Sequence, residues 1–300
     1  MLIEHEHEHR FAEHEHEAID LAETEHYREA METIELAAVQ MSSQADPDAN
    51  LERARALVLE AARKGARIVV LPENLAYMGN DEGKRALAEV LQAPFGRMAE
   101  TLSMAASDAG VYLIAGGIPE RSGDPQRPYN TCAVFAPDGS LIARYRKIHL
   151  FNVDLPDGTR QHESDANVAG DEPVVVDLDG FKVGLSICYD VRFPELYRRL
   201  VDLGASIIVI PAAFTLTTGK DHWHVLVRAR AIEAQCYVVA PGQWGRHGSR
   251  FTYGKSIIVD PWGEVIAQCS EGEGVCTASA SMAYLERVRS SLPALRHRRL

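Results

Sequence analysis

The sequence predicts an α/β fold in which two mixed β-sheets stack on each other and carry helices on their outer faces. The first observation is that apolar, strand-like runs alternate with amphipathic, helix-like segments along most of the chain. The second is a hairpin turn at Pro137-Asp138-Gly139, which adds antiparallel pairing to the sheets. The third is that 300 residues without an internal repeat or linker fit one large domain, or two small ones.

The elements follow one another in a regular order. We expect a first strand at residues 34–40 and a first helix at 46–64, which has one apolar face and ends at Gly65. Residues 152–172 are polar and rich in Gly, Pro and Asp, so they predict a loop. Further strands are expected at 68–71, 112–116, 131–136, 141–147, 174–177, 182–187, 206–210, 237–241, 256–259, 265–268 and 275–279. Further helices are expected around 82–91 and 95–108, and at 194–203, 222–235 and 283–292.

The net charge of −12 belongs mainly to one end of the chain. Residues 1–35 contain twelve acidic and two basic side chains, which leaves 31 acidic and 29 basic ones for the remainder. Residues 1–33 form an extension in which His and Glu alternate, with little apolar content, so we expect it to be disordered. It could bind Ni²⁺ or Zn²⁺ weakly, or be a silent extension or an artificial tag, and Met31 could be an alternative start.

Composition also narrows the compartment and the partners. No run of eighteen apolar residues and no signal peptide is present, so we expect no contact with a membrane. The five cysteines are odd in number and lack CxxC spacing, which favours a reducing, cytoplasmic location and argues against disulfides or a zinc site. No basic stripe indicates nucleic acid.

The most informative residue is Cys188. It ends the apolar run 181–187 and is followed within a few residues by Pro194, a residue typical of the first turn of a helix. A thiol at such a strand-to-helix corner is exposed to a substrate, with backbone N–H groups beside it. A buried structural cysteine is the alternative for any single Cys.

Two charged side chains also follow predicted strands. Glu73 ends the run 66–73, and Lys147 ends the run 141–147. In α/β sheets the carboxyl ends of strands are where distant side chains converge on a ligand. Taken singly, Glu73 could be a helix cap and Lys147 a solvated lysine. Together with Cys188, the two residues supply a base, a cation and a nucleophile.

The segments 71–74, 145–151 and 184–195, in this order and separation, resemble the three signature motifs of the nitrilase, or carbon–nitrogen hydrolase, superfamily. The resemblance covers residues 34–300, which we therefore expect to be the hydrolase domain. It implies a four-layer αββα sandwich, a homodimer or higher homo-oligomer with contacts through residues 222–235 and the helix after Cys188, and no metal or cofactor. It also implies that Glu73, Lys147 and Cys188 form a catalytic triad supported by Glu163.

The implied reaction is hydrolysis of a small-molecule amide through a thioester. Glu73 would act as general base and acid, and Lys147 would stabilise the oxyanion together with the backbone N–H of Tyr189. Further segments, residues 221–247 and 256–263, resemble the amidases of deaminated glutathione. An anionic substrate would need cations, for which Arg192 and Arg246 are candidates. Structural pairing of Arg192 with an acid such as Glu195, and plain solvation of Arg246, are the alternatives.

Other residues near the motifs receive lesser roles. Phe214 and Thr215 follow the strand at 206–210, and we expect them to line the pocket. His149, Trp223 and His224 are expected to pack or orient neighbours, and Asn130 simply to lead into its strand. Alternative activities are an ω-amidase on 2-oxoglutaramate, an N-carbamoyl hydrolase, a nitrilase, or a non-catalytic binding protein. Tyr189-Asp190 argues against a nitrilase, because nitrilases commonly have Trp-Glu there, and the intact triad argues against loss of catalysis.

Overall fold

The computed structural model describes residues 33–154 and 160–299. The disordered extension predicted for residues 1–33 therefore lies, except for Thr33, outside the described residues, as does residue 300. None of the helices in the described ranges combines the length and the hydropathy that a bilayer-spanning helix needs.

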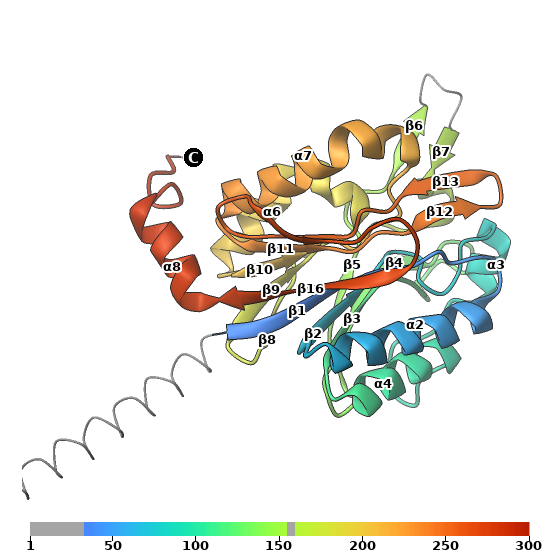
Figure 1. The fold of residues 1–300 in the computed structure, drawn as a ribbon. Coiled ribbons are helices and arrows are strands. Elements are labelled where there is room, and N and C mark those ends of the chain that lie inside the picture. Colours follow the sequence, from blue (N-terminus) through green and yellow to red (C-terminus); the bar gives the residue numbers. More distant parts are fainter. Residues whose placement is uncertain (1–32, 155–159, 300) are drawn as a thin grey trace, which may run out of the picture.

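The predicted sandwich is confirmed, since two mixed six-stranded sheets stack face to face (Figure 1). The first sheet contains, in spatial order, β16 (Gly274–Ser281), β1 (Thr33–Gln40), β2 (Ile68–Leu71), β3 (Tyr112–Glu120), β4 (Tyr129–Phe135) and β5 (Leu141–Arg146). The second contains β15 (Val265–Gln268), β14 (Ile257–Val259), β11 (Tyr237–Ala240), β10 (Ile207–Val209), β9 (Phe181–Leu185) and β8 (Val175–Leu178). In each sheet three central strands are parallel and the outer ones antiparallel.

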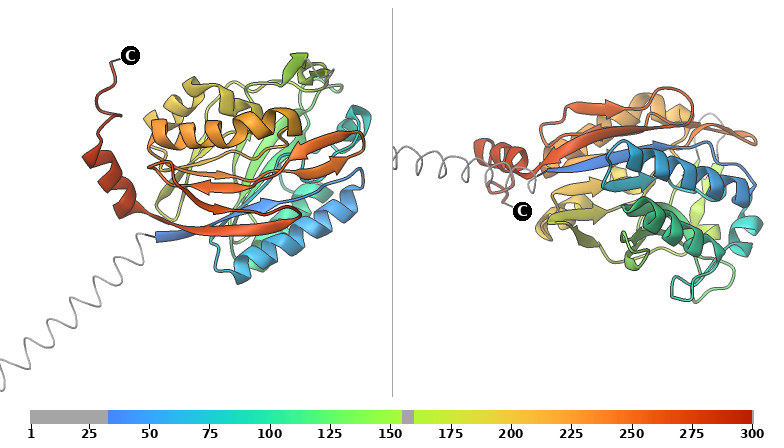
Figure 2. Two further views of the ribbon diagram at one scale, coloured as in Figure 1. Left: turned by 45° about the horizontal axis from the view of Figure 1, so that its top comes forward. Right: turned by 60° about the horizontal axis from the view of Figure 1, so that its bottom comes forward.

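Helices form the two outer layers (Figures 1 and 2). The helices α2 (Pro47–Arg63) and α4 (Arg97–Ala109) cover the first sheet, and α6 (Pro194–Asp202) and α7 (Leu216–Ala234) cover the second. The described chain also contains α3 (Asp81–Ala86), α5 (Glu163–Ala166), α8 (Met282–Ser291), a 3₁₀ turn (Cys188–Arg192) and the hairpins β6 (Asn152–Asp154) with β7 (Arg160–His162) and β12 (Trp244–His247) with β13 (Arg250–Tyr253).

The side chains of β1 show how the layers are held together. Leu36 and Ala38 belong to the apolar cluster between the two sheets, whereas Ala37 and Val39 belong to the cluster under α2 and α4. All four are completely buried. Because successive side chains of a strand point to opposite faces, a strand that is apolar at every position is what a sheet covered on both sides requires.

Three predicted elements differ from the structure. The helix expected at 222–235 already begins at Leu216, and its first turns include Gly219, a poor helix former that hides the early start in the sequence. A Cβ at Gly219 would lie 2.4 Å from the Tyr253 Cβ, so glycine allows the helix to pass this close. The helix expected around 82–91 is the short α3, which buries no side chain. The polar segment 152–172 contains β6, β7 and α5, and segment 244–253 forms a hairpin around Gly248-Ser249.

Candidate active site

Cys188 lies on a sharp turn after β9. Its φ angle is +47°, in the left-handed region that residues other than glycine rarely adopt, and a 3₁₀ turn and then α6 follow at once. Its backbone N–H donates to the Pro211 carbonyl over 2.8 Å, which ties the turn to the end of β10. In the described residues the N–H of Tyr189 has no hydrogen-bond partner. The turn therefore offers one free backbone donor directly beside the thiol.

The carboxylate of Asp190 holds this turn in place. It accepts hydrogen bonds from the Ile187 N–H (2.8 Å), the Tyr145 hydroxyl (2.7 Å), and the backbone N–H (3.0 Å) and ring Nδ1 (2.8 Å) of His149. Asp190 is completely buried, so each lost donor would leave carboxylate charge uncompensated. Burial and the negative charge of Asp190 raise the pKa of Tyr145 well above its usual value, which keeps its hydroxyl a donor. Asp190 thereby joins the Cys188 turn to the segment that follows Lys147.

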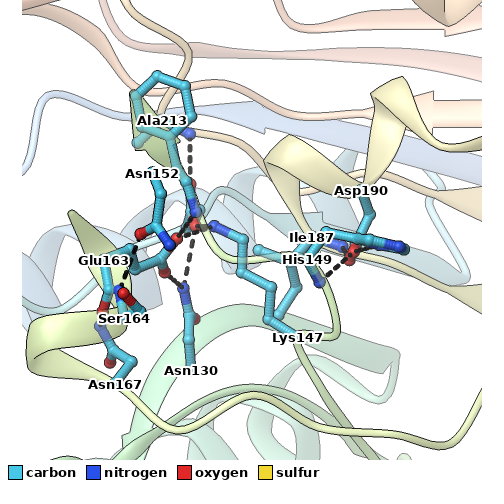
Figure 3. Close-up of polar contacts among 12 residues, drawn as sticks. Asn130, Lys147, His149, Asn152, Glu163, Ser164, Asn167, Ile187, Asp190 and Ala213 are labelled. Carbon is cyan, nitrogen blue, oxygen red and sulfur yellow. Dashed lines mark hydrogen bonds and ion pairs between the residues drawn. The ribbon is translucent and has the colours of Figure 1, made fainter. Parts of the chain in front are cut away.

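The second group of charges gathers around Lys147, directly after β5. Its Nζ lies 2.9 Å from Glu73 Oε1 and 2.8 Å from Glu163 Oε2, so one ammonium separates two carboxylates (Figure 3). The Phe151 N–H also donates to Glu163 Oε2 over 2.7 Å. Lys147 is only 2% exposed, which makes this a buried ion cluster rather than a surface pair.

Asn130 bridges the same two carboxylates, so the expectation that it only leads into its strand was wrong. From β4 its Nδ2 donates to Glu73 Oε1 (3.0 Å) and to Glu163 Oε1 (3.1 Å). The Ala213 N–H, from the segment after β10, donates to Glu73 Oε2 over 2.9 Å. In Figure 3 Asn130, Lys147 and Ala213 approach the carboxylates from different sides. The position and orientation of Glu73 are thus set by three donors from three separate segments.

The backbone of β3 runs close behind this cluster. A bulge between Ala115 and Ile118 contains Gly117, whose φ is +68°. A Cβ at Gly117 would lie 2.8 Å from Glu73 Cγ and 3.0 Å from Asn130 Oδ1. Only a glycine leaves room for these two side chains.

The charges of the cluster are mutually dependent. Although burial disfavours its charge, the carboxylates of Glu163 and Glu73 raise the pKa of Lys147 well above the usual value, so it stays an ammonium. Burial opposes ionisation of Glu163, but Lys147 outweighs it and lowers the pKa of that carboxyl. Burial and the charge of Glu73 raise the pKa of the Cys188 thiol, against the opposing charge of Lys147. The raised pKa favours the thiol form of Cys188, and the Glu73 carboxylate that contributes to this shift is the neighbouring group positioned to take its proton.

The residues predicted to bind substrate lie at different places. Arg192 makes no ion pair in the described residues; its guanidinium lies 5.3 Å from the ring centre of Phe214 and 5.8 Å from that of Tyr189, and within 3.4 Å of His222 Nδ1. The pairing considered with Glu195 is therefore absent there. Thr215 precedes α7 and its hydroxyl contacts that of Thr218 over 2.7 Å.

Arg246 lies on β12, where it is exposed and its Nε donates to the Gly248 carbonyl. No hydrogen bond or ion pair in the described ranges joins it to the Lys147 cluster. His149 stacks on Phe193 with ring centres 3.8 Å apart, and buried Trp223 donates to the Lys255 carbonyl, so both pack or orient neighbours as predicted. Within residues 33–154 and 160–299, no group of three or more His, Cys, Asp or Glu side chains is arranged to hold a metal ion.

The comparisons with known proteins identify the family of the chain and its fold. Residues 35–290 match the family model of the carbon–nitrogen hydrolases, so the chain belongs to that family and is an amide-hydrolysing enzyme. The fold is also that of solved nitrilase-superfamily proteins: the structure of Saccharomyces cerevisiae Nit3, a member of branch 10 of that superfamily, superimposes with a TM-score of 0.82 at 33% identity, covering 90% of this chain and 97% of that one.

Two curated relatives are more similar still in sequence. The deaminated glutathione amidase of Synechocystis sp. is 45% identical over 266 residues, which are 87% of this chain and 97% of the relative. The omega-amidase NIT2-A of Xenopus laevis is 43% identical over 251 residues, covering 83% and 89%.

Proposed function

We propose that the protein hydrolyses deaminated glutathione to 2-oxoglutarate and cysteinylglycine through a thioester on Cys188. The observation that carries the mechanism is the meeting of Glu73, Lys147 and the Cys188 thiol in one buried site. The substrate is suggested by the Synechocystis relative, which is named a deaminated glutathione amidase and is matched over 97% of its length.

In the proposed first half-reaction Glu73 takes the thiol proton as Cys188 Sγ attacks the amide carbon. The carbonyl oxygen becomes an anion, which the Lys147 ammonium and the free N–H of Tyr189 stabilise. Glu73 then gives the proton to the departing nitrogen, and the C–N bond breaks to leave the thioester. In the second half-reaction Glu73 deprotonates a water, which releases the acid and restores the thiol. These steps use no metal ion or cofactor.

Glu163 supports this sequence without touching the substrate in the proposed scheme. With Glu163 present, the Lys147 ammonium remains charged when Glu73 is transiently neutral. Arg192 is the proposed anchor for a substrate carboxylate, because it is a cation without an acidic partner among the described residues and lies against Phe214, near the turn that carries Cys188. Thr215 and Arg246 stay weaker candidates for substrate contacts, Arg246 because it is exposed.

An ω-amidase acting on 2-oxoglutaramate is the second candidate, favoured by the Xenopus relative. Both substrates carry a 2-oxo acid and differ in the group that leaves. The test is a parallel assay of the full chain with deaminated glutathione, 2-oxoglutaramate, a simple nitrile and an N-carbamoyl amino acid. We expect the highest kcat/KM for deaminated glutathione. A higher value for 2-oxoglutaramate would make it an ω-amidase, and preference for either of the others would contradict both proposals.

We also propose a cytoplasmic homodimer or higher homo-oligomer, built on the hydrolase domain of residues 34–300 with the extension of residues 1–33 outside it. Support for the oligomer comes from α7, which leaves the side chains of Val225 and Ile232 66% and 48% exposed, one heptad apart on the same face of the helix. Sedimentation of the full chain at micromolar concentration tests this, and a monomer would contradict it.

A further inference from the structure

Two free thiols lie together at one edge of the sandwich, outside the Lys147 cluster. Cys269 follows β15, the edge strand of the second sheet, and Cys276 lies in β16, the edge strand of the first. Figure 1 shows β16 running along β1 at this edge. The two thiols thus belong to different sheets, although seven positions separate them in the sequence.

Two backbone carbonyls define how close the thiols are. The Ala38 carbonyl oxygen lies 3.9 Å from Cys269 Sγ and 3.7 Å from Cys276 Sγ. The Ser256 carbonyl oxygen accepts the Cys269 N–H over 2.8 Å and lies 3.6 Å from Cys276 Sγ. Both sulfur atoms therefore lie around the same carbonyl oxygen, where the edges of the two sheets meet.

The surroundings favour ionisation of Cys269. Hydrogen bonding from the Cys276 thiol lowers the pKa of Cys269 against the effect of burial, and the charge of Lys64 acts in the same direction. Lys64 is held nearby by the Val275 carbonyl, which accepts from its Nζ over 3.1 Å. Cys269 is 7% exposed and Cys276 half-buried, and Ser270 and Glu271, which follow Cys269 in the chain, are exposed. The partial exposure of Cys276 gives a small oxidant access to the pair.

We propose that Cys269 and Cys276 are a modification site at which a hydroperoxide forms a disulfide between the edges of the two sheets. The Cys269 thiolate attacks the peroxide and forms an S–O bond as the O–O bond breaks, which gives a sulfenic acid; the departing hydroxide or alkoxide takes up the proton that the Cys269 thiol gave up and leaves as water or an alcohol. The Cys276 sulfur then attacks Cys269 Sγ, and the hydroxyl leaves as water with the Cys276 proton. The two sulfurs lose two electrons in total, and the peroxide gains them.

The experiment uses the full-length folded protein and hydrogen peroxide, followed by denaturation, alkylation with N-ethylmaleimide and peptide mass mapping. Trypsin leaves both cysteines in one peptide, residues 256–287, while cleavage after Glu271 or Glu273 separates them. We expect peptide 256–287 to become lighter by two hydrogens and to take up no alkylating agent. After cleavage at the glutamates, the two fragments should stay joined until a reductant is added.

Two variants make the result specific. In Cys276→Ser no joined fragments should form, and Cys269 should stop at the sulfenic or sulfinic acid. Cys236→Ala removes a buried thiol elsewhere and should leave the joined fragments unchanged. The proposal is overturned if peptide 256–287 still takes two alkyl groups after an exposure that has oxidised Cys188 in the same sample, or if Cys269 is found joined to another cysteine. Both readings are independent of which amide the enzyme hydrolyses.

Discussion

The two sheets position their contributions to the site by different means. The first sheet and the segments after it bring Glu73, Asn130 and Lys147, whose side chains hold each other through hydrogen bonds and ion pairs. The second sheet brings Cys188, whose position is set by a strained backbone and by the buried Asp190. The comparison teaches that charges are fixed here by their partners, whereas the nucleophile is fixed by the path of the chain. Changes on the two sides should therefore have different consequences.

The largest effect is expected for a change at Cys188, the contribution of the second sheet. Cys188→Ala should lower kcat at least about 10⁴-fold, because the nucleophile itself is removed. The Tm should stay close to that of the wild type, since Asp190 and not the thiol makes the hydrogen bonds that hold the turn. Activity assays and thermal unfolding of the same preparation measure both, with Cys236→Ala as the matched control. Turnover near the wild-type rate would rule out the thioester.

Among the contributions of the first sheet, the substitution Lys147→Met should reduce both activity and stability. Loss of an oxyanion donor lowers kcat by about 10²–10³-fold. Removing one partner of a buried ion cluster costs about 3–5 kcal/mol, because Glu73 and Glu163 are left facing each other. Lys182→Met, at an exposed lysine of β9, is the control and should change neither.

The pH dependence of stability separates the contribution of Lys147 from that of Glu163, because the two are lost in opposite directions of pH. The pKa of Lys147 is raised in the folded state. Its contribution to the free energy of unfolding is therefore complete below the pKa that Lys147 has in the unfolded chain, and it is lost as pH rises through the pKa of the folded state. The pKa of Glu163 is lowered, so its contribution is present above the unfolded pKa and is lost as pH falls through the folded one. Urea unfolding of wild type and Lys147→Met should therefore differ most at neutral pH. An equal difference at strongly acidic pH would argue against the ion cluster as its source.

A smaller effect is expected for Asn130→Ala. The amide positions two carboxylates, so we expect kcat to fall about 10–100-fold with little change in KM. Because the Glu163 carboxylate loses a donor that favours its charged form, the acidic limb of the pH–rate profile should move to higher pH. Asn167→Ala is the control, since that buried amide reaches only the backbone oxygen of Glu163. Equal profiles for both variants would reduce Asn130 to a packing residue.

The sequence allowed prediction of the layers and of the residues that carry charge or a thiol after strands. Cys188, Glu73 and Lys147 could be located because each ends a predicted strand, which is a local signal. Asn130 could not, since its role depends on two carboxylates 57 and 33 positions away. Asp190 was part of a recognised motif, but its four hydrogen bonds depend on how the segment after β5 meets the turn. The hairpin at 244–253 had a local signal, since Gly248-Ser249 is a turn pair between two short runs. The polar residues in both runs made them look like a loop and not like strands.

The bulge at Gly117 has a consequence for anyone who wishes to diversify this enzyme. Gly117 contacts no substrate in the proposed scheme, yet any side chain there would displace Glu73 and Asn130 together. In a saturation library selected for turnover, this position should return glycine alone, while the exposed positions of α2 accept wide variation. Attempts to broaden the substrate range should therefore leave β3 untouched and concentrate on the loops that follow the second sheet.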